Sequence, residues 1–234
     1  MIKIISFKIC PFVQRVTTLL EVKNIPYEIE FISLSNKPQW FLDISPTGQV
    51  PVLITESGEA LFESEAIVEY LDEVTKPIEP DLSPEERAKD RAWGYQASKN
   101  YLVQCSAQRS ADHTTLKERT EKLGKVFEKA ERIFGDGPYF KGDKISNVDV
   151  AWLPLLHRAS IIEKYTCYDF LKEYPKVKLW QSTLLNTGLA KKSVSEDFED
   201  AFTGFYLSEK TFLGSGNDCS KSNMDGECAT SNCC

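Results

Sequence analysis

The hydrophobic and polar positions follow two different rhythms along the chain, and the change falls near residue 76. Before that point, short apolar runs rich in β-branched residues alternate with segments whose apolar residues recur at helical spacing. The pattern predicts a strand, a helix, a strand, a two-stranded hairpin and a helix, over residues 2–7, 11–23, 27–32, 52–62 and from 64 on. The order β-α-β followed by β-β-α predicts a small mixed sheet packed with helices.

The second part of the chain has a helical rhythm throughout. Residues 77–83 contain prolines and no periodic apolar pattern, so we expect a linker there. Ser83 and Ser146 each stand three residues before an acid, which is the signature of a capped helix start. We therefore predict an α+β protein, with a thioredoxin-like domain over residues 1–76 and an all-helical domain over residues 84–207.

The last segment, residues 208–234, follows neither rhythm. It is rich in Ser, Asn, Gly and Cys and lacks apolar periodicity, which predicts disorder. Its cysteines are Cys219, Cys228, Cys233 and Cys234. They could belong to a solvated tail without a dedicated role, or capture a soft metal or metalloid through their thiolates. The terminal pair also resembles a lipidation signal. No function is inferred from this segment.

Composition and charge narrow the classes of partner. The chain has 28 basic and 35 acidic side chains and a formal charge of -7, which argues against a general nucleic-acid or anionic-membrane binder. We find no signal peptide and no apolar window long enough to span a membrane, so we expect a cytoplasmic protein with reduced thiols. A membrane partner would require lipidation of Cys233 and Cys234. His113 and His157 have no ligand-spaced partners, so no metal site is expected.

Cys10 is the strongest candidate for chemistry. It follows a predicted strand and directly precedes Pro11, so its sulfur should lie at the N-terminus of a helix. Unpaired amides and the helix dipole there stabilise a thiolate and lower the cysteine pKa, and Arg15 could add positive potential. The alternative is an inert buried cysteine. Position 13 is valine, which leaves a single thiol rather than a dithiol pair.

Three further features could bind an extended, doubly charged ligand. Val50-Pro51 enters a predicted strand; a cis bond there would offer a backbone ladder to a peptide, while a trans bond would only begin an edge strand. Glu63-Ser64 falls where a strand meets a helix, and the helix start suits a carboxylate. Ser64 could equally be a plain N-cap. Lys37 lies in a predicted polar connection, where it could simply be solvated.

Several of these segments together resemble one family, the glutathione transferases, and most of all the omega class. The matching segments are CPFVQRV, NKPQWFLDISPTGQVPVL, LFESEAIVEYLDE and ISNVDVAWLPLLHR, in the family's order, within about residues 1–207. The resemblance implies glutathione as co-substrate, a homodimer, and a glutathione-dependent thiol transferase or dehydroascorbate-type reductase. Its other substrate would be a small-molecule or protein mixed disulfide.

The resemblance also implies roles for three residues around the thiol. Cys10 matches the omega-class cysteine that forms a mixed disulfide with glutathione. Phe12 matches the aromatic residue at the edge of the glutathione site. Arg158 matches an arginine that lines the pocket of the second substrate.

The remaining matches concern glutathione itself. Lys37 matches a lysine that approaches the glycyl carboxylate, and Val50 matches the residue whose backbone pairs with the cysteinyl part. Pro51 matches the family's cis-proline. Glu63 and Ser64 match the pair that holds the γ-glutamyl end.

Two other functions stay open from the sequence. A transferase that conjugates electrophilic xenobiotics would keep its activity after replacement of Cys10. A non-enzymatic binding module would show a Cys10 of ordinary pKa and no affinity for glutathione.

Overall fold

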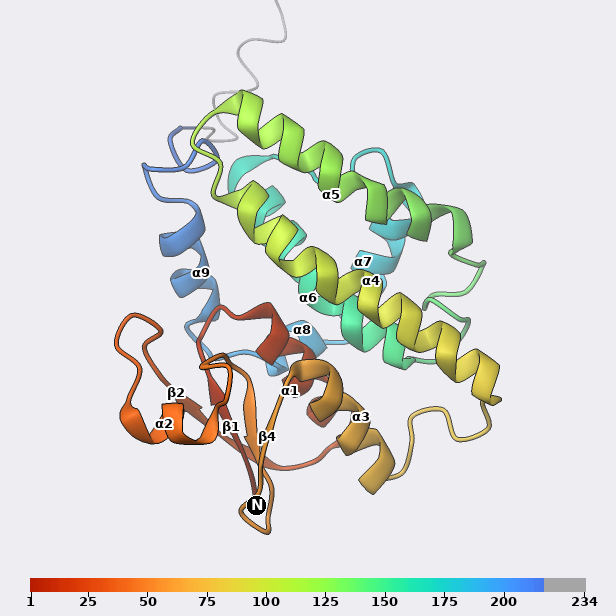
Figure 1. The fold of residues 1–234 in the computed structure, drawn as a ribbon. Helices are drawn as coiled ribbons and strands as arrows, with labels where there is room; N and C mark the ends of the chain where they lie inside the picture. The colour runs from red at the N-terminus through yellow and green to blue at the C-terminus, as the bar shows by residue number, and fades with distance from the viewer. Residues whose placement is uncertain (217–234) are drawn as a thin grey trace, which may run out of the picture.

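The computed structural model describes residues 1–216, which form a small sheet with helices and a larger helical part (Figure 1). In the first part the elements are β1 (Ile2–Ser6), α1 (Pro11–Lys23), β2 (Tyr27–Phe31), α2 (Gln39–Ile44), β3 (Val52–Ile54), β4 (Ala60–Phe62) and α3 (Ser64–Val74). In the second they are α4 (Pro84–Gln108), α5 (His113–Ile133), α6 (Asn147–Thr166), α7 (Pro175–Asn186), α8 (Leu189–Lys192) and α9 (Phe198–Tyr206). The predicted α+β class is confirmed.

The four strands form one mixed sheet in the order β2-β1-β3-β4. β1 runs parallel to β2 and antiparallel to β3, which is antiparallel to β4. Successive side chains of β1 point to opposite faces, so Ile4 packs with α1 and α3 while Ile5 packs with Phe41 of α2. The sheet is therefore covered by α1 and α3 on one face and by α2 on the other.

The helix α2 was not predicted, because the sequence around Lys37 suggested only a polar connection. α2 has six residues and no side-chain cap at its N-terminus. A single buried side chain, Phe41, fixes it against the sheet. One apolar residue is too short a pattern to reveal a helical period.

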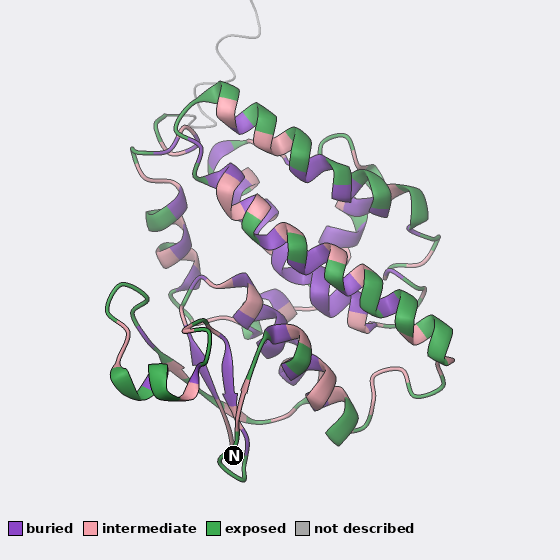
Figure 2. Cartoon of the chain, viewed as in Figure 1, coloured by how far each residue is buried: buried purple, intermediate pink, exposed green. Residues whose placement is uncertain are grey.

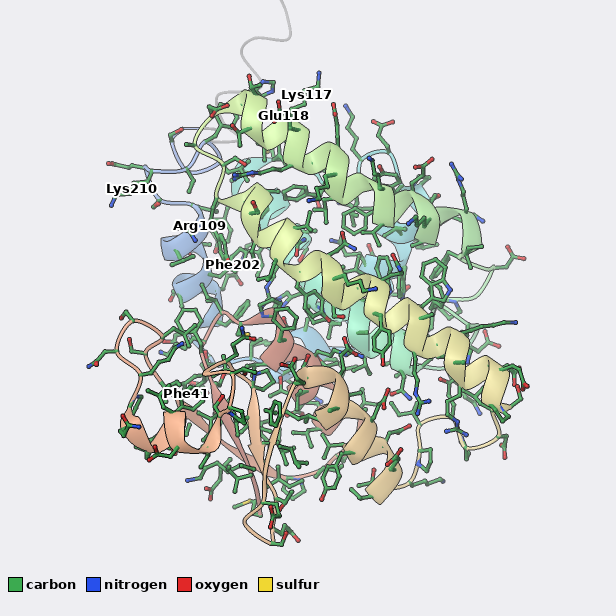
Figure 3. The ribbon with its side chains drawn as sticks, in the orientation of Figure 1. Phe41, Arg109, Lys117, Glu118, Phe202 and Lys210 are labelled. Atoms are coloured by element: carbon green, nitrogen blue, oxygen red, sulfur yellow. The ribbon has the colours of Figure 1, made fainter. Side chains whose placement is uncertain are left out.

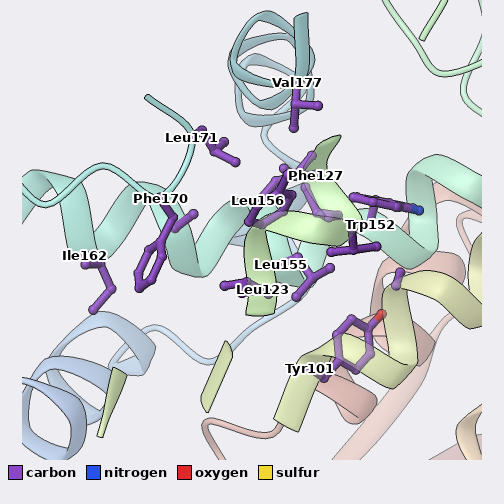
Figure 4. Close-up of a cluster of buried hydrophobic side chains, with 14 of the residues drawn as sticks. Tyr101, Leu123, Phe127, Trp152, Leu155, Leu156, Ile162, Phe170, Leu171 and Val177 are labelled. Atoms are coloured by element: carbon purple, nitrogen blue, oxygen red, sulfur yellow. The ribbon is translucent and has the colours of Figure 1, made fainter. Parts of the chain in front are cut away.

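The helical part is built around α6, whose residues are buried on nearly every side (Figure 2). The ring of Trp152 of α6 packs at a tilt against Phe127 of α5, with 6.3 Å between ring centres (Figure 4). It packs in the same way against Trp180 of α7, with 5.2 Å between ring centres. Tyr101 of α4 donates a hydrogen bond to the Ala151 carbonyl of α6. These aromatic contacts make one continuous core, which is why α6 reads as apolar without a polar face.

Capping explains where α4 and α6 begin. Both predicted capping boxes are present: Ser83 exchanges hydrogen bonds with Glu86, and Ser146 does so with Asp149. Asp149 is buried, which raises the pKa of its carboxyl group, and it also accepts a hydrogen bond of 2.7 Å from the Trp180 indole. The cap therefore ties the start of α6 to the aromatic core as well as satisfying free amides.

Helix α1 belongs to the sheet but also packs on the helical part. Thr17 donates a hydrogen bond of 2.6 Å to the Ser193 carbonyl, and the Gln14 amide lies 2.9 Å from Nδ1 of His157. Gln14 is buried at this contact. Burial of the imidazole, together with the nearby Arg158 charge, lowers the pKa of His157 to about 3. The imidazole is therefore neutral and acts as a hydrogen-bond acceptor in the core rather than as a ligand.

Residues 208–216 are ordered, which differs from the disorder that we predicted from residue 208 on. Residues 208–216 fold back on the helical part, where the Phe212 amide donates a 2.7 Å hydrogen bond to the Ser110 carbonyl and Leu213 is buried. Two apolar side chains and a cap by Thr211 suffice to anchor a segment that has no periodicity. The four tail cysteines lie outside the described residues. Within residues 1–216, no helix is long and apolar enough to cross a membrane.

Candidate active site

Cys10 occupies the N-cap position of α1, as its place before Pro11 predicted. Its amide donates a hydrogen bond of 3.0 Å to the Phe7 carbonyl, which closes the turn from β1 into the helix. Its Sγ lies 3.9 Å from the Val50 carbonyl oxygen. The thiol therefore stands between the start of α1 and the strand entry at β3.

The pKa of the Cys10 thiol differs from the sequence expectation. Burial raises it to about 11, although the Val13 and Phe12 amides and the Arg158 charge act in the lowering direction. The helix start supplies the expected stabilisation, but removal of water from the sulfur outweighs it in the ligand-free protein. Arg15 is not the cation of this site, because its guanidinium pairs with Glu65 of α3.

Arg158 holds the backbone next to Cys10 in place. It is completely buried, and its Nη2 donates a 3.1 Å hydrogen bond to the carbonyl of Ile9, the residue before Cys10. Its Nη1 donates to the Pro154 carbonyl at 3.0 Å and to Oε1 of Gln14. Arg158 therefore does not line the open cleft of a second substrate, contrary to expectation. It fixes the turn that carries Cys10 and brings positive charge beneath the sulfur.

The residues predicted to bind glutathione meet in a small cleft of about 130 Å³. Its lining consists of Phe12, Thr47, Gln49, Val50, Pro51, Glu63 and Ser64. The Val50-Pro51 bond is cis, which is the first of the two alternatives that the sequence left open. Ser64 is the first residue of α3, and Glu63 precedes it as N-cap with φ of 66°. Ser64 is thus not the N-cap, and the free amides at the start of α3 border the cleft.

Lys37 lies beside this cleft rather than in its lining. Its Nζ comes within 3.6 Å of the point where a Cβ on Gly48 would lie. Gly48 has φ of 60° and makes the turn before the cis bond. The Lys37 ammonium group therefore lies next to the Gly48 turn, which comes two residues before Val50 in the chain.

A larger cleft of about 550 Å³ opens on the other side of Cys10. Cys10 and Phe12 line it from the start of α1, and Phe12 lines both clefts. Leu34, from the connection after β2, and residues near Cys10 also line it. The remaining lining residues come from α4 and its C-cap, α5 and α9: Leu102, Cys105, Ser106, Arg109, Arg119, Phe205 and Tyr206. Cys10 consequently stands where a small peptide-like cleft and a larger apolar one meet.

Sequence reasoning missed Cys105, Arg109 and Arg119 as residues of this cleft. Cys105 is half-buried and borders the cleft, rather than being an inert core residue. A signal exists in the sequence, since Leu102, Ser106 and Arg109 recur at the spacing of one helix face. The pattern does not say which face borders the thiol, because that depends on how α4 packs against the first domain.

The described residues hold no group of three or more metal-ligating side chains, and the site's chemistry is that of a thiol, amides and cations. The expectation that the chain lacks a metal site is not tested by this geometry.

Comparison with known proteins gives matches to both parts of the chain. Residues 9–74 match the description "Glutathione S-transferase, N-terminal domain", and residues 102–196 match "Glutathione S-transferase, C-terminal domain". The chain is 35% identical to glutathione S-transferase omega-1 of Rattus norvegicus, over 86% of this chain and 82% of that one. It is 29% identical to glutathione S-transferase DHAR3, chloroplastic, of Arabidopsis thaliana, over 84% of this chain and 72% of that one.

Among solved structures, the fold resembles glutathione transferase Omega 3C from Trametes versicolor. The TM-score is 0.71 at 26% identity, and the match covers 83% of this chain and 89% of that one. The matches with these two relatives and this structure each cover more than 80% of this chain, so the likeness extends over both the sheet and the helical part.

Proposed function

The chain belongs to the glutathione S-transferase family, and from that premise we propose that it transfers thiols through a glutathionylated Cys10. It is a glutathione-dependent enzyme of the omega and dehydroascorbate reductase type, with glutathione as co-substrate. The observation that supports our mechanism is the position of a cysteine sulfur, not a hydroxyl, 3.9 Å from the Val50 carbonyl where the two clefts meet.

Glutathione fits the small cleft by its chemistry. It is an extended tripeptide with a carboxylate at each end and an amine at one end. The Val50 backbone next to the cis bond would pair with its middle residue. Ser64 and the start of α3 would hold the γ-glutamyl carboxylate, and Glu63 its amine. Lys37 would bind the glycyl carboxylate from beyond the Gly48 turn.

The cycle has two thiol–disulfide exchanges. The Cys10 thiolate attacks the glutathionyl sulfur of a mixed disulfide, so a Cys10–glutathione disulfide forms and the other half leaves as a thiolate. A second glutathione thiolate then attacks that disulfide, which releases oxidised glutathione and restores Cys10. The Arg158 charge and the Phe12 and Val13 amides stabilise the Cys10 thiolate each time it leaves.

The test is glutathione-dependent reduction of a glutathionyl mixed disulfide by wild type, Cys10→Ala and Cys105→Ala. We expect Cys10→Ala to lose at least about 100-fold in kcat/KM, since no second nucleophile replaces the thiolate in this cycle. Cys105→Ala is the matched control, because it removes the other thiol of the same cleft. Undiminished turnover by Cys10→Ala would refute the mechanism. Conjugation of an electrophile that survives in Cys10→Ala would favour a conjugating transferase.

We also propose that the protein is a cytosolic homodimer. Its α3 and α4 enclose a third cleft, of about 370 Å³, which Glu65, Glu69, Arg91 and the partly exposed Tyr95 line. Charges of both signs on one face suit self-complementary pairing of two copies. Light scattering of the purified protein tests it; a monomeric mass at micromolar concentration would contradict the dimer.

A further inference from the structure

The larger cleft carries a charge opposite to that of the chain. The whole protein has a formal charge of -7, yet the residues that line this cleft include Arg109 and Arg119 and, within residues 1–216, no aspartate or glutamate. A cleft with low-dielectric walls concentrates the field of such charges. The local field therefore favours an anion at the same opening that leads to Cys10.

Both arginines are held in place by contacts that leave their charge free. Arg119 of α5 donates through Nη1 to the Ser106 carbonyl at 2.8 Å and to the Ser110 hydroxyl at 3.4 Å. Arg109, labelled in Figure 3, is the C-cap residue of α4. Its guanidinium carbon lies 5.3 Å from the centre of the Phe205 ring of α9. Neither arginine forms an ion pair with any residue in the part of the chain that the structure describes.

The Asp112 carboxylate lies near enough to Arg119 to be influenced by its charge, but it is hydrogen-bonded to another residue. The hydrogen bonds from Thr115 chiefly lower the pKa of Asp112, and the Arg119 charge adds a small part. The Asp112 carboxylate accepts hydrogen bonds of 2.8 Å from the amide and the hydroxyl of Thr115, as the N-cap of α5. Asp112 does not line the cleft. The N–H groups at Nε and Nη2 of Arg119 are therefore available to donate hydrogen bonds to a ligand.

The walls between the arginines and the thiol are apolar and accessible. Leu102 is 65% exposed, Phe205 is 45% exposed and Leu34 is 38% exposed, and all three line the cleft. A volume of about 550 Å³ with apolar walls and a few convergent polar groups is typical of a small-molecule site. A ligand with an aromatic or branched apolar group and one carboxylate would pack against the apolar walls and pair with the arginines.

We propose that the second substrate is an anionic apolar thiol, bound as its mixed disulfide with glutathione, and that Arg109 and Arg119 bind its carboxylate. This proposal rests on the thiol-transferase function proposed above. The Cys10 thiolate attacks the glutathionyl sulfur, the bond to the apolar half breaks, and that half takes the electron pair and leaves as a thiolate. The two arginines bind its acid before the exchange and also attract the negative charge that forms as it leaves.

The test compares two mixed disulfides of glutathione that differ in one charge. Their aromatic halves are para-mercaptophenylacetate and its neutral amide, in which a methylene group insulates the ring from the charge. We expect wild type to prefer the acid by about tenfold in kcat/KM, which corresponds to about 1.4 kcal/mol. The preference should fall to about threefold in Arg109→Gln or Arg119→Gln and to about one in the double variant, with the neutral substrate changed by less than about twofold.

Two further variants separate charge from structure. Arg119→Lys keeps the charge and should keep most of the preference, even where the hydrogen bonds to Ser106 and Ser110 are lost. Arg132→Gln removes the same charge from the far end of α5, where Arg132 pairs with Glu128 on the surface, and should keep all of it. A wild-type preference near one, or a preference that persists in the double variant, would overturn the proposal. Absent turnover of both disulfides would instead overturn the thiol-transferase function.

Discussion

The two clefts beside Cys10 are built from different materials. The small cleft lies where the cis bond before β3 meets the start of α3, so main-chain groups of both segments border it. The larger cleft is formed by side chains on the facing surfaces of α4, α5 and α9. Its walls are exposed apolar residues, whereas the side chain of Ser64 in the small cleft is buried.

This difference teaches which part of the specificity the fold sets and which part the sequence sets. A backbone amide or carbonyl keeps its hydrogen-bonding role whatever side chain it carries, so the small cleft accepts the same peptide as long as the fold persists. The charge and size of the larger cleft change with a single substitution, as at Arg109 or Leu102. Glutathione recognition should therefore be hard to alter, and the choice of second substrate easy.

The largest expected effect is a loss of stability on replacement of Arg158. This residue holds the turn of Cys10, where the two clefts meet, so its loss should affect both clefts. Arg158→Met leaves Oε1 of Gln14 and the Ile9 carbonyl without their buried donor. Each unpaired buried acceptor costs about 1–3 kcal/mol, so we expect the free energy of unfolding to fall by about 3 kcal/mol. Urea denaturation measures it, with Lys164→Met, an exposed cation one and a half turns along α6, as control. Equal stabilities of the two variants would show that Arg158 is not a structural support.

A second prediction concerns the thiol itself. Because burial raises the pKa of Cys10 to about 11, its thiolate fraction and its rate of alkylation by iodoacetamide should rise about tenfold per pH unit from pH 7 to 9. The rate at the Cys10 peptide, followed by mass spectrometry, should show no plateau in that range. Free glutathione under the same conditions is the control. A plateau near pH 7 would mean that the Phe12 and Val13 amides outweigh burial.

The sequence predicted the small cleft better than the larger one, and the reason is physical. Cys10-Pro11, Val50-Pro51 and Ser64 are local signals, since each depends on neighbours in the chain for its conformation. The positions of Arg109 and Arg158 depend on how α4 and α6 pack against α1, which no local pattern encodes. Arg158 was therefore expected in the second-substrate pocket, although it is completely buried beneath the thiol.

The sign of the Cys10 pKa shift was missed for a related reason. A helix start is visible in the sequence, and its lowering effect is present through the Val13 amide. Burial is different, because Cys10 packs against an apolar cluster that brings together α1, β1, β3, α3 and Val150 of α6, and these elements are far apart in the chain. Electrostatics of local origin can be anticipated from a motif, whereas desolvation requires the tertiary structure.

The smallest expected effects are changes in KM that distinguish binding in the small cleft from binding in the larger one. Ser64→Ala removes a hydroxyl from the small cleft, and a hydrogen bond to a charged group is worth about 1.5–3 kcal/mol, so KM for glutathione should rise at least about tenfold. KM for the mixed disulfide should rise with it, because the glutathionyl half of that substrate binds in the same cleft, but the preference between different apolar halves should not change. Phe205→Ala is the matched change in the larger cleft, and it should raise KM for an aromatic disulfide about fivefold while leaving KM for glutathione within about twofold.

Steady-state kinetics with each substrate varied in turn measures all four constants. Because both variants keep Cys10 and the buried contacts of Arg158, the rate of Cys10 alkylation should equal that of wild type in each. If Ser64→Ala changed the preference between apolar halves, or if Phe205→Ala raised KM for glutathione as much as KM for the aromatic disulfide, the two clefts would act as one site. The division between a cleft set by the main chain and a cleft set by side chains would then be wrong, because a change in one would have propagated through Phe12, the side chain that lines both.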